Sequence, residues 1–202
     1  MNIVKRLYDW MLSWGNSRWG ALALFCFAFA ESSFFPIPPD VLLIALCLGV
    51  TTRSFRYAAL CLLGSVLGGM VGYSIGYFLW QTSAGEYTAL ANFFFNHVFS
   101  VESFEQVGAL YDKYNFWIVF TAGFTPLPYK IFTISGGLFH INFSMFLIAS
   151  IVSRGLRFFL IAALIWKFGA PIKVFIEKYF NLLAIAFTVL LVGSFFLLGK
   201  LF

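Results

Sequence analysis

Charged residues are scarce in this chain, and their scarcity excludes a soluble globular protein. Only 10% of the 202 residues are Asp, Glu, Lys or Arg, and 61% are hydrophobic, whereas soluble domains usually carry about 25% charged residues. The net charge of +5 does not indicate nucleic acid as a partner, because the bases lie at the ends of apolar segments instead of in one cluster. The composition predicts a single integral membrane domain.

Patterns of metal and catalytic chemistry are also lacking. The three cysteines, Cys26, Cys47 and Cys61, lie in apolar stretches and form no C-x-x-C pair, which argues against a disulfide framework or a zinc site. The H-E-x-x-H, G-x-S-x-G and P-loop patterns do not occur. We therefore expect no metal, no cofactor and no enzymatic activity.

Two apolar segments are present that prolines divide into short arms. Residues 19–50 and 115–141 each contain two apolar arms, and ten helical residues cover only about 15 Å of a hydrocarbon core about 30 Å thick. A hairpin that enters and leaves on the same side fits such arms, provided that protein surrounds it. We expect two re-entrant hairpins here, with residues 101–114 as an amphipathic surface helix before the second.

The other segments complete an all-α polytopic membrane protein. Residues 1–18 are predicted to form an interfacial amphipathic helix, and residues 57–80 and 143–166 are full-length spans that complete the membrane domain 19–166. Residues 167–202 form a basic loop and a final transmembrane helix.

Charge asymmetry indicates the topology. With both hairpins re-entrant, residues 1–18, 51–56 and 167–178 lie on one side of the membrane and carry eight of the thirteen bases. Because basic loops stay in the cytoplasm, the N-terminus is predicted to be cytoplasmic and the C-terminus to lie outside.

The proline turns repeat. Superposing Pro36 on Pro126 also places Pro38 on Pro128 and Asp40 on Lys130, and each copy is followed by a full span. The first copy carries one more proline, Pro39. The hairpins would open to opposite sides, and an inverted repeat with broken helices near the midplane is typical of a transporter site.

Five charged residues are predicted to lie at membrane depth: Glu31, Asp40, Lys130, Arg154 and Arg157. Each costs about 2.5 to 3.5 kcal/mol on insertion scales unless it is paired or hydrated. The three bases are expected to bind an anionic lipid head group. Asp40 is expected to pair with Lys130, its counterpart in the repeat, and Glu31 to hydrogen-bond the broken helix ends. Both acids would take up protons when the lipid displaces them from the bases.

Four glycines recur at every fourth position of the first full span: Gly64, Gly68, Gly72 and Gly76. They share one helix face and allow another backbone to approach closely. This face predicts static close packing or homodimerisation more strongly than a sliding surface for the neighbouring hairpin.

Glu31 with "PIPPD", then "GFTPLPYK" with "SGG", then "SRGLRF" together resemble the DedA family, also called the SNARE-associated Golgi or VTT-domain family, and most closely its YqaA-like branch. The resemblance covers roughly residues 20–165. It implies two re-entrant hairpins packed against full spans and movement of polar-headed lipids between leaflets, in several members driven by the proton motive force. It also implies that Glu31, Asp40 and Lys130 are functional. The family has a further arginine just before the second proline turn, where this chain has Gly123 and Phe124; Arg154 or Arg157 is expected to supply that charge.

Three functions are compatible with these patterns. The first is a lipid translocase for polyprenyl phosphate or a phospholipid, proton-coupled or passive. The second is a membrane assembly factor whose charges only lock the two halves together. The third is a small-ion or drug/proton antiporter.

Overall fold

The computed structural model describes residues 19–33, 38–80, 88–89, 92, 101–125, 127–169 and 171. Within these residues every regular element is a helix. The prediction of an all-α fold is confirmed to that extent. The predicted interfacial helix over 1–18 and the predicted final transmembrane helix, together with Pro36 and Pro126, lie outside the described residues.

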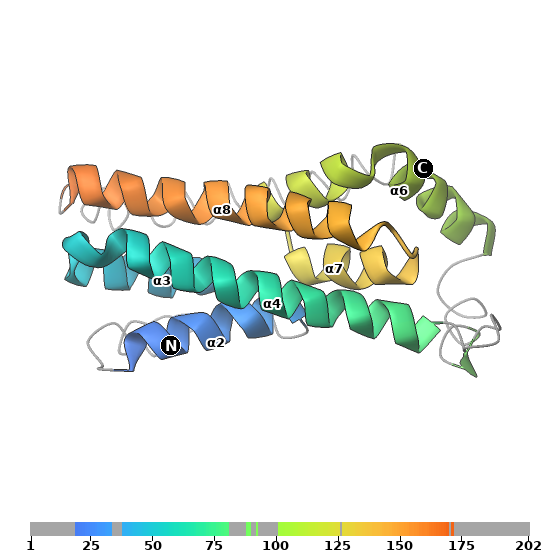
Figure 1. Ribbon diagram of the computed structural model, residues 1–202, viewed down its shortest axis with the longest axis horizontal. Helices are drawn as coiled ribbons and strands as arrows, with labels where there is room; N and C mark the ends of the chain where they lie inside the picture. Colours follow the sequence, from blue (N-terminus) through green and yellow to red (C-terminus); the bar gives the residue numbers. More distant parts are fainter. Residues whose placement is uncertain are drawn as a thin grey trace, which may run out of the picture.

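Two long apolar helices run side by side through the molecule (Figure 1). They are α4, Ser54–Trp80, and α8, Phe143–Phe168. A short 3-10 helix, η1, Thr51–Arg53, precedes α4. Both are long and apolar enough to cross a membrane. Asn142 begins α8 by accepting a hydrogen bond from the Met145 amide at 3.0 Å, as helix-capping side chains do.

The first proline-broken segment forms two short helices. These are α2, Gly20–Ser33, and α3, Pro39–Gly49. At 1.5 Å per residue they are about 21 and 16 Å long, less than a hydrocarbon core. Pro39 stands at the start of α3, where its fixed φ and missing N–H are tolerated. The short arms are therefore as predicted.

The second segment differs from the prediction. Residues 101–114 and 116–125 do not form separate elements, because α6 is one continuous helix, Val101–Phe124. Neither proline nor glycine separates the two predicted pieces, so the helix has no reason to stop between them. The helix α7, Tyr129–Leu138, follows after the second proline turn. This hairpin thus has one arm of 24 residues and one of 10.

The four glycines of α4 are covered by helices of the same chain. A Cβ at Gly68 would lie 2.9 Å from Phe29 Cα of α2, and one at Gly76 would lie 2.8 Å from the Ile134 carbonyl carbon of α7. Gly64 likewise meets α2, and Gly72 meets both α2 and α7. The close-packing prediction is confirmed, and a homodimer would have to use another surface.

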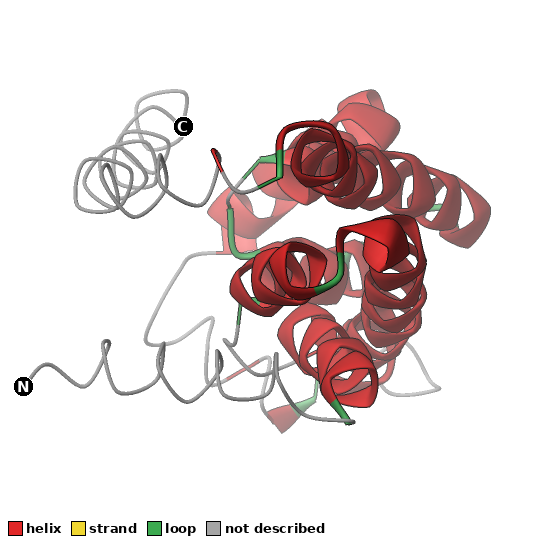
Figure 2. Ribbon diagram, turned by 90° about the vertical axis from the view of Figure 1, so that its left-hand side faces the viewer, coloured by secondary structure: helices red, strands yellow, loops and turns green. Residues whose placement is uncertain are grey.

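The packing has apolar cores at its two ends and a polar layer between them. One core joins α2, α3, α4 and α8 around Leu42, Cys61 and Phe158, and the other joins α4, α6, α7 and α8 around Tyr73 and Phe146. Figure 2, seen along the bundle, shows the helices in cross-section. The buried polar residues Ser32, Ser65, Thr133, Ser150, Ser153 and Arg154 come between these cores. Arg154, one of the five charged residues predicted at membrane depth, lies in this layer.

Candidate ion-pair site between the two hairpins

The helix α8 carries both arginines of the site. Arg154 and Arg157 are three residues apart, so they project from the same side of the helix. Each reaches a carboxylate more than a hundred residues away in the sequence, on the first hairpin. The two charge pairs link α8 to α2 and to α3.

Arg154 is enclosed on every side. Its Nη2 donates to Glu31 Oε2 at 2.5 Å and its Nε donates to Ser65 Oγ at 2.7 Å. The guanidinium carbon lies 4.8 Å from the ring centroids of both Tyr129 and Phe158, a distance at which rings stabilise a cation. Only 3% of the Arg154 side chain is exposed.

Arg157, in the middle of α8, connects the start of α3 to the end of α6. Its Nε and Nη2 donate to the two carboxylate oxygens of Asp40 at 3.0 and 2.9 Å, the two-pronged geometry that suits a guanidinium. Its Nη1 donates to the Thr125 carbonyl at 2.5 Å. Because carbonyls at the end of a helix lack backbone partners and carry partial negative charge, Arg157 satisfies the end of α6 as well as Asp40.

The predicted pairing of Asp40 with Lys130 is wrong. Asp40 pairs with Arg157, because the Arg157 guanidinium, which also donates to the Thr125 carbonyl of the second turn, reaches the first turn from α8. Lys130 stands in the first turn of α7, half-buried. Across the described residues its side chain makes no recorded hydrogen bond or ion pair.

The predicted role of Glu31 is also wrong in its detail. Glu31 holds Arg154, and the broken end of α2 is satisfied by a residue that sequence reasoning missed. Thr133 Oγ1 of α7 donates to the Ser32 carbonyl at 2.9 Å. This bond joins the first hairpin directly to the second.

Hydroxyl groups lie around the Arg154–Glu31 pair. Ser32 Oγ and Ser65 Oγ lie 2.7 Å apart, and Tyr129 donates its hydroxyl hydrogen to Ser150. The signal in the sequence was the presence of serine and threonine within apolar helices, where hydroxyls join helices by hydrogen bonds. These contacts were not predicted, because hydroxyl groups carry no formal charge.

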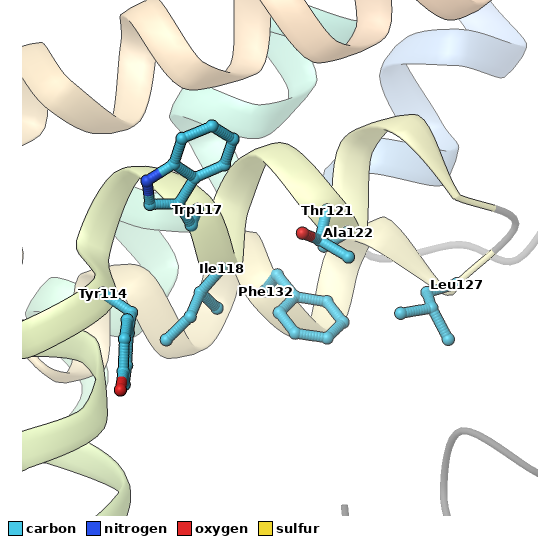
Figure 3. Close-up of a pocket in the computed structure, with 7 residues that line it drawn as sticks. All are labelled: Tyr114, Trp117, Ile118, Thr121, Ala122, Leu127 and Phe132. Carbon is cyan, nitrogen blue, oxygen red and sulfur yellow. The ribbon is translucent and has the colours of Figure 1, made fainter. Parts of the chain in front are cut away.

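An open apolar groove of about 280 Å³ lies beside the second turn (Figure 3). The side chains that line it come from α6, the turn and α7: Tyr114, Trp117, Ile118, Thr121, Ala122, Leu127 and Phe132. The chain from Thr121 to Phe132 therefore provides groove walls, the carbonyls that Arg157 binds, and Lys130.

The arrangement holds two acids against two arginines, so the paired charges cancel. The structure brings together four of the five residues that were predicted at membrane depth. Among the described residues no three His, Cys, Asp or Glu side chains form a group that could hold a metal ion. The chemistry available at this place is the binding of an anion by guanidinium groups, in competition with the carboxylates.

Two proteins resemble this chain over nearly its whole length. An uncharacterized protein of Haemophilus influenzae is 33% identical over 200 residues, covering 98% of this chain and 99% of the relative. An uncharacterized protein of Histophilus somni is 33% identical over 181 residues, covering 88% of this chain and 91% of the relative. No protein-family model and no solved structure matches the chain. The chain belongs to the same family as these two uncharacterized proteins.

Proposed function

We propose that this chain is a polytopic bacterial inner-membrane protein of the DedA type that moves a phosphate-bearing lipid between leaflets. The observation that carries the proposal is the pair of ionic contacts, Glu31–Arg154 and Asp40–Arg157. Charged side chains are costly at membrane depth, and a buried ion pair is seldom more stable than well-packed apolar residues. An anionic ligand that replaces the acids as the partner of the arginines would give these charges a function, whereas stability alone does not explain them.

The helix arrangement supports an inverted repeat. In this proposal α2–α3 and α6–α7 are re-entrant hairpins that enter from opposite sides and meet at the polar layer, against the spans α4 and α8. The Thr133–Ser32 bond is such a meeting point. Because α6 is longer than an ordinary re-entrant arm, its acidic first half, with Glu102, Glu105 and Asp112 exposed, would stand outside the hydrocarbon.

The transport step would follow from competition. A lipid phosphate would take up hydrogen bonds from Lys130 and from an arginine of the site, which leaves the acid that pairs with that arginine without its cationic partner. A carboxylate that loses its cation in a low-dielectric site gains a proton more readily. Lipid movement would then be linked to proton uptake. The apolar groove beside the second turn suits the hydrocarbon part of such a ligand.

Transport in liposomes tests the proposal. The purified full-length protein is reconstituted with fluorescent polyprenyl phosphate, and the exchange between leaflets is followed by quenching from outside, at several pH values. Arg157→Gln and Lys130→Gln are expected to slow exchange at least tenfold. Lys167→Gln, an exposed base at the end of the same helix α8, is the charge-matched control and is expected to behave like the native protein. Lack of exchange by the native protein would contradict the proposal.

The topology has its own test. Single cysteines at Arg53 and within residues 1–18, in a background without the native cysteines, are labelled from each side of the membrane. Both positions are expected to react from the cytoplasmic side. Labelling of position 53 from outside only would mean that residues 19–50 cross the bilayer, and the inverted repeat would be lost.

One observation favours the assembly-factor alternative. All four charges of the two pairs are mutually satisfied, as a static lock between the two halves would require. The same liposome assay separates the two functions. Exchange that is unchanged in both Arg154→Gln and Arg157→Gln, together with a lower unfolding temperature, would favour the lock.

A further inference from the structure

We infer that the two arginines of α8 do different work: Arg157 is the guanidinium that exchanges Asp40 for the anionic head group, whereas Arg154 keeps Glu31 throughout as a permanent lock. The inference rests on the proposed function and names the cation at which the ligand binds. Nothing in the amino-acid sequence distinguishes the two arginines, since their spacing of three residues places them on one helix face.

Arg154 has no free route for a ligand. Its guanidinium lies between two aromatic rings and contacts Glu31, Ser65 and, at 3.4 Å, Ser32 Oγ. Phe158 belongs to the apolar core at one end, and Tyr129 to the core at the other. An anion could reach this group only if the packing of both cores opened. A cation enclosed in this way serves to hold α2, α4 and α8 together.

Arg157 is accessible in comparison. Its side chain is 18% exposed and that of Asp40 is 19% exposed, against 3% for Arg154. The Asp40 oxygens occupy the Nε and Nη2 positions in parallel. Two oxygens of a phosphate group can make the same two bonds, because the guanidinium fork fits phosphate and carboxylate alike.

The carbonyl contact explains how Arg157 can exchange partners without moving. Its Nη1 is held by the Thr125 carbonyl at 2.5 Å and lies 3.5 Å from the Phe124 carbonyl. Neither bond uses the face that Asp40 occupies. The guanidinium therefore stays fixed at the end of α6 when Asp40 leaves, and an anion meets a donor pair already in place. Asp40, released at a partly exposed position, can be hydrated or protonated.

Removing the competing acid tests this division of roles. The full-length protein in dodecyl maltoside micelles is titrated with radiolabelled dodecyl phosphate, and thermal unfolding is measured on the same samples without ligand. Asp40→Asn is expected to raise the affinity for dodecyl phosphate about tenfold, because the phosphate then no longer competes with a charged hydrogen-bonded carboxylate for Arg157. Glu31→Gln is expected to lower the unfolding temperature more than Asp40→Asn does and to leave the affinity within about twofold of the native value.

Lysine variants complete the test, because lysine keeps the charge but not the planar fork. Arg157→Lys is expected to weaken dodecyl phosphate binding with little change in unfolding temperature, and Arg154→Lys to lower the unfolding temperature with binding retained. Lys167→Gln serves as the control for both measurements.

Two results would overturn the inference. In the first, Glu31→Gln raises the affinity for dodecyl phosphate as much as Asp40→Asn does. In the second, Asp40→Asn leaves that affinity unchanged or lowers it. Both presuppose binding by the native protein, so they leave the proposed function standing. Absence of dodecyl phosphate binding in the native protein and in Asp40→Asn would instead overturn the proposed function and the exchange at Arg157 together. The lock role of Arg154 would then be decided by the unfolding temperatures of the two lysine variants.

Discussion

Alanine at Gly76 of α4 is expected to destabilise the protein relative to alanine at Gly69 of the same helix. Both glycines are buried, but their surroundings differ. A Cβ at Gly76 would collide with the Ile134 carbonyl oxygen and lie 2.8 Å from the Leu138 amide nitrogen. These are backbone atoms of α7, so α7 would have to move away. A Cβ at Gly69 would meet only side-chain atoms, the nearest at 3.6 Å, which is ordinary van der Waals contact.

The magnitude follows from the comparison of the two sites. Replacing glycine by alanine inside a helix gains about 0.5–1 kcal/mol through the backbone entropy, and this gain applies at both positions. Overpacking costs typically about 1–3 kcal/mol and applies only at Gly76. The helix contribution cancels in the difference. Gly76→Ala is therefore expected to be about 1–3 kcal/mol less stable than Gly69→Ala.

Reversible unfolding in mixed detergent micelles, followed by far-ultraviolet circular dichroism, measures this difference. Gly68→Ala, whose Cβ would meet the Phe29 backbone of α2, is expected to behave like Gly76→Ala. Equal stability of Gly69→Ala and Gly76→Ala would refute the claim that α7 packs on α4 backbone to backbone.

Three further predictions concern single contacts, each measured by the same unfolding assay. Tyr73→Phe removes the hydroxyl that donates to the Ile141 carbonyl at 2.6 Å and is expected to cost about 1–3 kcal/mol, because the buried carbonyl is left unsatisfied; native stability would show that another donor reaches it. Asn142→Ala removes the cap of α8 and is expected to cost about 1 kcal/mol, whereas Asn142→Ser should retain most of the stability. His140 has a φ of 52°, so His140→Gly is expected to leave stability unchanged or raise it by up to about 1 kcal/mol, and a clear loss would show that the His140–Tyr77 ring contact outweighs the backbone strain.

Helix positions were the most predictable part of the fold. Pro39 and Pro128 mark the starts of short helices in the structure because proline cannot continue a helix from the preceding turn but fits its first residues. The glycine face of α4 was visible as a four-residue period. The error at residues 101–124 arose because a change from polar to apolar composition was taken as a break, although a helix continues through such a change.

The pairing of charges was less predictable. That charged residues at membrane depth would need partners was expected from the cost of leaving them alone in a membrane, and four of the five have partners in the structure. Their partners were not, because the superposition of the two proline turns compares hairpin with hairpin and contains no information on α8. The hydroxyl contacts of Thr133 and Tyr129 were missed for a related reason: neutral polar side chains cost less to bury, so they leave a weaker signal in composition.

The amino-acid sequence by itself determined what local rules govern: the apolar character, the places where helices begin and break, and the residue types that need partners. Only the tertiary structure decided that Glu31 meets Arg154 and Asp40 meets Arg157, across 123 and 117 residues of chain. Periodicity and capping act within about four residues along a helix. Which acid reaches which arginine depends instead on how α8 packs against the two hairpins, and that packing is set by the summed contacts of all the helices.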